Sequence, residues 1–210
     1  MKLAVILFLA AGCSLTPAAT LYSTFGPGDT YSSLQDTVGD GHTFHQTWGA
    51  MWADPFTVSG AAHVTAYRVA VRGGTSNASF VLSLWSGSVS PTTLVEGNVT
   101  SPVLGGTQQI LTLGSPSSPA LDPGTTYWLV MDATDPVADT LYWYRNDLPG
   151  LFRKRALTGG PWGTGFMGSD VFEIQGRSTP LVDSPEPGTA LLFAAALAGI
   201  AMGRTRRIGS

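Results

Sequence analysis

The chain has 210 residues, of which 12% are charged, 26 are glycine and 14 are proline. This composition is typical of a loop-rich β protein rather than a helical one, and the length is sufficient for one domain with a sizeable core. The formal net charge is −3, and the sequence has no basic stripe, which argues against a nucleic-acid-binding protein.

Residues 1–19 have the features of a secretory signal peptide. Lys2 gives a charged start, residues 3–11 form a short apolar core, and the small residues Ala18 and Ala19 offer a cleavage site. Residues 10–13 also resemble a bacterial lipoprotein cleavage box, so lipidation of Cys13 remains an alternative. Cys13 is the one cysteine of the chain, so the mature domain must be stabilised by its core without an intramolecular disulfide.

Eight or nine short strands are expected between residues 20 and 178. Residues 63–72 show the clearest pattern, because Thr65, Tyr67, Val69 and Val71 alternate with residues of the opposite face. A second strand is expected at residues 80–85, after a glycine-rich turn. Weaker strands are expected at residues 43–51, 56–58, 94–100 and 108–113, while residues 21–49 are otherwise predicted to be loop.

Residues 126–131 are the most β-prone run and are apolar on both faces, which predicts a central strand. Residues 140–145 are expected to be its hairpin partner across a loop at 132–139. Residues 159–168 are predicted to be a glycine-rich loop and residues 170–176 the last strand. With no convincing helix before Ala190, this pattern predicts an all-β, antiparallel, jelly-roll-like sandwich over residues 20–178, followed by a linker at 179–184.

The last 26 residues combine three features in a fixed order. A rigid polar triplet comes first and consists of Pro185, Glu186 and Pro187. Residues 190–202 then form an uncharged apolar run, which predicts a single transmembrane helix. Residues 188–203 would span about 24 Å as a helix, against roughly 30 Å of bilayer hydrocarbon. A basic end follows and consists of Arg204, Arg206 and Arg207, which is typical of the cytoplasmic side.

This tail resembles the PEP-CTERM protein-sorting signal of Gram-negative bacteria that make exopolysaccharide. The resemblance implies processing by an exosortase, a membrane-embedded cysteine transpeptidase-like enzyme that recognises the triplet. Transfer to the envelope or release outside the cell would follow, with signal peptidase and the secretion machinery as earlier partners. An ordinary tail anchor after a proline linker is the alternative interpretation of the same residues.

The sandwich region also resembles a known group of domains. The hydrophobic pattern of residues 50–176, with the Pro-Gly-Thr-Thr-Tyr-Trp phrase at 123–128, is similar to bacterial exported domains called choice-of-anchor domains. This resemblance implies a β-sandwich and little about biochemical activity.

Two groups of residues have the chemistry of metal ligands. His42 and His45 form a His-x-x-His pair near Asp36 and Asp40, which can bind a transition metal; two exposed loop histidines are the alternative. A second group, within one loop, consists of Asp132, Asp135 and Asp139. Carboxylates in a loop can hold a structural calcium ion, although the demands of the turn explain these residues equally well. No other cofactor is expected.

Aromatic and charged residues suggest further sites. Trp162 lies in the glycine-rich loop and is the best candidate for stacking on a sugar ring, whereas Trp128 and Trp143 are expected in the core. Glu96 and Glu173 are the glutamates of the strand region that could serve a glycoside hydrolase. The basic run at residues 153–155 is either a solvated loop, a site of proteolysis or a contact for an anionic polysaccharide.

These observations favour an exported, non-enzymatic β-sandwich protein that is delivered to the envelope or extracellular matrix by its tail. A carbohydrate-binding module for the exopolysaccharide of the host is the alternative, and a polysaccharide hydrolase or lyase is a third hypothesis. No Gly-x-Ser-x-Gly motif supports nucleophilic catalysis.

Overall fold

The computed structural model describes residues 18–39, 50–75, 77–135, 139–156 and 161–179, and only the backbone at 50, 148–156 and 165–167. The described residues form strands and turns and no helix, so the expected all-β class is confirmed. None of them belongs to a helix long and apolar enough to cross a membrane. Most of the signal segment and the whole sorting tail lie outside the described residues.

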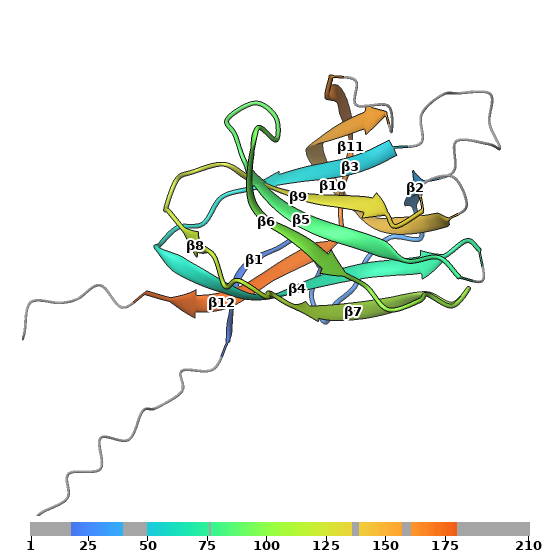
Figure 1. The fold of residues 1–210 in the computed structure, drawn as a ribbon, viewed down its shortest axis with the longest axis horizontal. Coiled ribbons are helices and arrows are strands. Elements are labelled where there is room, and N and C mark those ends of the chain that lie inside the picture. Colours follow the sequence, from blue (N-terminus) through green and yellow to red (C-terminus); the bar gives the residue numbers. More distant parts are fainter. Residues whose placement is uncertain (1–17, 40–49, 76, 136–138, 157–160, 180–210) are drawn as a thin grey trace, which may run out of the picture. The chain divides into compact units, whose positions relative to one another are not determined.

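Twelve strands follow one another along the described chain (Figure 1). In order they are β1 (Ala19–Ser23), β2 (Gln35–Gly39), β3 (Ala50–Phe56), β4 (Ala62–Gly73), β5 (Phe80–Ser86), β6 (Thr93–Thr100), β7 (Gln109–Gly114), β8 (Ala120–Leu121), β9 (Tyr127–Ala133), β10 (Thr140–Ala156), β11 (Gly163–Asp170) and β12 (Phe172–Ser178).

The strands form two facing layers of antiparallel sheet. In one layer β4 pairs with β7, β8 and β12, and β12 pairs with β1. In the other layer β9 pairs with β3 and β5, and β5 pairs with β6. Figure 1 shows β3, β9, β5 and β6 on one side and β1, β12, β4 and β7 on the other. The described part is therefore an all-β, sandwich-like fold.

The 17-residue strand β10 joins the two layers. Its first half, Leu141 to Trp143, pairs with β4, while residues 140–144 also pair with β2. Its second half, Arg153 to Ala156, pairs with β3, and residues 145–154 pair with β11. The backbone hydrogen bonds of one strand are thus divided between both layers.

The predicted hairpin between residues 126–131 and 140–145 is wrong. β9 is a central strand, as expected, but β3 and β5 occupy both of its edges, and β10 pairs with other strands. The reason is that alternation and apolar content identify a strand, whereas the partner of that strand is decided by the packing of the whole sheet.

The main core lies between the layers. Tyr67, Val69 and Val71 of β4 are at most 1% exposed, so the predicted inward face of this strand is confirmed at these positions. They belong to one cluster with Leu129 of β9 and Phe172 of β12. Trp128 and Trp143 are also buried, at 1% and 0% exposure, as expected.

Several segments predicted to be loops are strands. β2 and part of β1 lie within residues 21–49, and β11 begins at Gly163, inside the loop expected at 159–168. β3 runs from Ala50 to Phe56, where two separate strands were expected at residues 43–51 and 56–58. Glycine in β11 reflects close contact rather than a turn, because a Cβ atom at Gly168 would lie 2.2 Å from the Asn146 carbonyl oxygen. The expected start of a strand at residues 43–49 lies outside the described residues.

Candidate functional site

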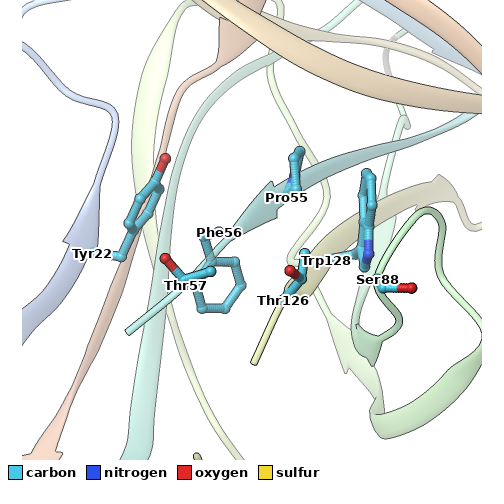
Figure 2. A pocket seen from close by; sticks show the side chains of 7 residues that line it. All are labelled: Tyr22, Pro55, Phe56, Thr57, Ser88, Thr126 and Trp128. Carbon is cyan, nitrogen blue, oxygen red and sulfur yellow. The ribbon is translucent and has the colours of Figure 1, made fainter. Parts of the chain in front are cut away.

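A pocket of about 400 Å³ opens where the two layers meet at β1, β3 and β9. Its aromatic walls are Tyr22, Phe56 and Trp128, and its hydroxyl groups come from Thr57, Ser88 and Thr126. Figure 2 shows Tyr22 and Trp128 on opposite sides, with Pro55 and Phe56 between them. Thr57 and Ser88 are exposed and Tyr22 is half-buried, whereas Phe56 and Trp128 are 3% and 1% exposed.

Hydrogen bonds fix the loop that carries Ser88 against β9. The Trp128 indole N–H donates to the Gly87 carbonyl at 2.6 Å, and the Gly87 N–H donates to the Thr126 carbonyl at 3.1 Å. A side chain at Gly87 would lie 2.1 Å from the Ser90 carbonyl oxygen, so the tight turn requires glycine there. The positions of Ser88 and Thr126 relative to each other are therefore fixed.

Packed aromatic rings fix the opposite wall. The Tyr22 ring lies 5.5 Å from the Phe56 ring and 5.5 Å from the Phe172 ring, and Phe172 lies 6.2 Å from Trp143. These centroid distances are in the range of favourable tilted aromatic pairs. Tyr22, from the short strand β1, is thus anchored to both layers of the sandwich.

Two buried carboxyl groups lie near this wall. Asp54 precedes Pro55 in β3 and shares one face of the strand with Trp52 and Phe56, so it faces the interior and is 0% exposed. Asp170, at the end of β11, is 1% exposed. One proton allows the two side chains to share a hydrogen bond, and the backbone N–H of Asp170 also favours the charged form of Asp54.

Burial is the main reason why both carboxyl groups resist ionisation. It raises the pKa of Asp54 to about 7, against the opposing effect of the hydrogen bond with Asp170. Burial also raises the pKa of Asp170 well above 3.8, and the charges of Asp54 and Asp36 act in the same direction. Asp36 is paired with Arg145 at 3.4 Å. Burial, followed by the charge of Asp54, raises the pKa of Tyr22.

The sequence prediction missed this pair of acids. Asp54 lies between the two strands that were expected at residues 43–51 and 56–58, so neither strand included it. The signal that could have identified it is an acid at an inward position between the large apolar residues Trp52 and Phe56. The pair can hold and release a proton, and within the described residues no group of three or more His, Cys, Asp or Glu side chains is arranged to hold a metal ion.

The three acids of the predicted calcium loop have separate roles. Asp139 is buried and accepts hydrogen bonds from the backbone N–H groups of Asp135 at 3.2 Å and Ser79 at 3.4 Å. Asp132 is half-buried in β9, and burial raises the pKa of its carboxyl despite the Ala133 N–H. Asp135 is exposed. The Asp139 side chain therefore closes the turn. The demands of the turn were one of the two explanations that the sequence left open for this residue.

Trp162 lies beside other tryptophans rather than at a loop tip. It is partly buried and packs on a small cluster of Ala53, Trp128 and Val130, to which Met51 and Trp85 also contribute. Trp85 and Trp128 are register partners on β5 and β9. This cluster is the outer face of the same strands that form one side of the pocket.

The two glutamates considered for glycoside hydrolysis have structural partners. Glu96, buried in β6, accepts hydrogen bonds from the Tyr67 hydroxyl at 2.5 Å, from the Ser115 hydroxyl at 2.8 Å and from the Ser117 N–H at 2.8 Å. Burial raises the pKa of Glu96, but the donors from Ser117, Tyr67 and Ser115 together lower it below the ordinary value. The network ties β6 to β4 and to the segment after β7.

Glu173 takes part in a different network. It pairs with Arg68 at 2.8 Å and accepts a hydrogen bond from Thr20 at 3.1 Å. Arg68 also pairs with Asp29 at 2.6 Å and lies over the Phe25 ring. This network fastens the segment after β1 to β4 and β12.

Other predicted site residues fall on undescribed parts of the chain. Those outside the described residues are Cys13, Asp40, His42, His45, Pro185, Glu186, Pro187, Arg204, Arg206 and Arg207. The basic run at 153–155 lies in β10, not in a loop, because its residues pair with β3 and partly with β11. No protein-family model matches the chain, and no curated protein matches it with significant similarity.

The buried carboxyl pair predicts that stability falls as pH rises. A carboxyl pKa raised in the folded state contributes stability that is complete below about 3.8 and is lost as pH rises through about 7. Each extra proton bound by the folded state gives a slope of about 1.4 kcal/mol per pH unit. Asp54→Asn should flatten the fall in urea-unfolding free energy between pH 5 and pH 8, and should stabilise the protein at pH 8 by about 2–4 kcal/mol.

Asp122→Asn is the control for this experiment, because it removes an exposed carboxyl with the same change in net charge. Equal losses of stability between pH 5 and pH 8 in the wild type and in Asp54→Asn would show that the pair is not the titrating element.

The Glu96 network predicts the opposite dependence at acid pH. Glu96→Gln removes the charge that several donors stabilise, so it should lower the unfolding free energy at pH 7 by about 1.5–3 kcal/mol. Because the folded pKa is lowered, this contribution is present above the unfolded pKa and is lost as pH falls below it. The difference between variant and wild type should therefore shrink at pH 3. A constant difference at both pH values would contradict a stabilising role of the charge.

Proposed function

We propose that this chain is an exported, non-enzymatic protein whose jelly-roll-like sandwich is delivered to the cell envelope or extracellular matrix by exosortase processing. The observation behind this proposal is the tripartite order of the tail. The triplet Pro185, Glu186 and Pro187 is followed by an apolar run at 190–202 and then by Arg204, Arg206 and Arg207. In this proposal the triplet is recognised, the apolar run holds the precursor in the inner membrane, and the arginines fix its orientation.

The N-terminal sequence supports export independently of the tail. Residues 1–19 combine a charged start, an apolar core and small residues at the cleavage site. The single cysteine, Cys13, precedes the sandwich. Signal peptidase, the secretion machinery and the exosortase are therefore the partners that this proposal requires.

The intact mass of the protein from its native host tests the proposal. In the presence of the exosortase, we expect loss of the residues after the Pro-Glu-Pro region, and in a strain without the enzyme we expect the full tail. Replacing Pro185, Glu186 and Pro187 with alanine should leave the tail intact in the enzyme-positive strain.

An alanine triplet at residues 179–181 is the matched control, because it changes the linker and leaves the recognition element in place. Normal processing of the Pro-Glu-Pro variant would contradict the sorting assignment. An intact tail in both strains would make the protein an ordinary membrane-anchored sandwich. The same spectrum reports whether the mature chain begins at a lipid-modified Cys13.

The second candidate function is binding of the exopolysaccharide that the host makes. The observation that favours it is the pocket with aromatic walls and hydroxyl groups, since stacking and hydroxyl hydrogen bonds are the usual contacts of sugars. We expect the purified full chain to bind the host polysaccharide with a change in tryptophan fluorescence. Absence of both binding and fluorescence change would remove this candidate and leave the sorting proposal untouched.

A further inference from the structure

We propose that the pocket between β1, β3 and β9 binds one neutral saccharide unit at the end of a glycan chain. This inference rests on the second candidate function and assigns its site, its ligand class and its mode of binding. Three properties of the pocket lead to it, namely its uncharged lining, its small volume and its rigid construction.

The lining has no charged side chain. All seven residues that Figure 2 labels are aromatic, proline, serine or threonine. A carboxylate or sulfate on a sugar would lose its hydration in this pocket without gaining a positive partner, and that loss is costly. Hydroxyl groups of Thr57, Ser88 and Thr126 can both donate and accept hydrogen bonds, as the hydroxyls of a neutral sugar require.

The volume of the pocket favours a single saccharide unit rather than a long stretch of glycan chain. A volume of about 400 Å³ lies near the lower end of the range of small-molecule pockets. Phe56 and Trp128 are almost wholly buried, so their rings offer little exposed surface on which a sugar could stack. The half-buried Tyr22 is the ring that can contact the apolar face of a sugar.

The pocket is preorganised for a small ligand. The indole of Trp128 is fixed by Gly87, and the ring of Tyr22 is fixed by Phe56 and Phe172. Because these groups are held before binding, little conformational freedom is lost when a ligand enters. Trp162 packs on the outer cluster of Ala53, Trp128 and Val130 and is not part of the pocket lining. The pocket is therefore a different site from the one at Trp162 that the sequence suggested.

The experiment uses the full chain and oligosaccharides made from the purified host exopolysaccharide by partial acid hydrolysis. Anion exchange divides the fragments into a neutral and an acidic fraction, and binding is followed by calorimetry. We expect the neutral fraction to bind. The variant Thr57→Val/Ser88→Ala, which loses two exposed hydroxyls, should weaken this binding about three- to tenfold or more. Thr57→Trp should abolish it by filling the mouth of the pocket.

Thr112→Val is the matched control, since it removes an exposed threonine hydroxyl from β7 and should leave the affinity unchanged. Trp162→Ala should also bind as the wild type does. Wild-type affinity in Thr57→Trp, particularly with loss of binding in Trp162→Ala, would overturn the pocket but retain polysaccharide binding. Binding of the acidic fraction alone would overturn the neutral ligand, and absence of any saccharide binding would overturn the second candidate function as well.

Discussion

The division of β10 between two layers is the constraint on which the rest of this structure depends. A sandwich without a disulfide is held together by side-chain packing between its sheets, and here a continuous strand adds a covalent and hydrogen-bonded connection between them. The pairing of Trp143 with Val71 of β4 and the pairing of Arg153 with Ala53 of β3 belong to the same strand. Because an unpaired buried backbone group is costly, the register of one half of β10 restricts where the other half can pair. The relative placement of β3 and β4 therefore depends on this strand.

The pocket is a consequence of that placement. Its walls come from β1 of one layer and from β3 and β9 of the other, so no single sheet could form it. The rings of Tyr22, Phe56 and Phe172 connect the layers at this point and belong to the main core or pack against it. A change in the spacing of the layers would alter the contact between these rings and the width of the pocket together. Stability and the shape of the pocket are therefore coupled at Tyr22 and Phe56 by shared packing.

The sequence predicted the elements of the sandwich better than their partners. Alternation in β4 and the apolar run of β9 identified both strands, because burial on one face or on two faces leaves a direct mark on the residue pattern. The partners of β10 could not be predicted, since they depend on contacts far apart in the chain. Trp128 was correctly expected in the core, but its part in a pocket was not foreseen, because Tyr22 and Ser88 come from segments predicted to be loop or turn. The glycines of β11 suggested a loop, because glycine is common in turns.

Two buried acidic sites show that residue type alone does not predict the charge state of a carboxyl group. Glu96 is surrounded by donors from Tyr67, Ser115 and Ser117, so its charged form is stabilised. Asp54 lacks such a set of donors and is wholly buried, so burial stabilises its neutral form instead. Both are carboxyl groups in strands of the same sandwich, and both are almost wholly shielded from solvent. The difference arises from the neighbours that the fold brings in. The serine-rich segment after β7 supplies hydroxyl and N–H donors to Glu96, whereas the junction of β2, β3 and β11 brings three aspartates together with one arginine. Protonation at this junction relieves the repulsion between the aspartates that these strands bring together, so the stability of the junction depends on pH.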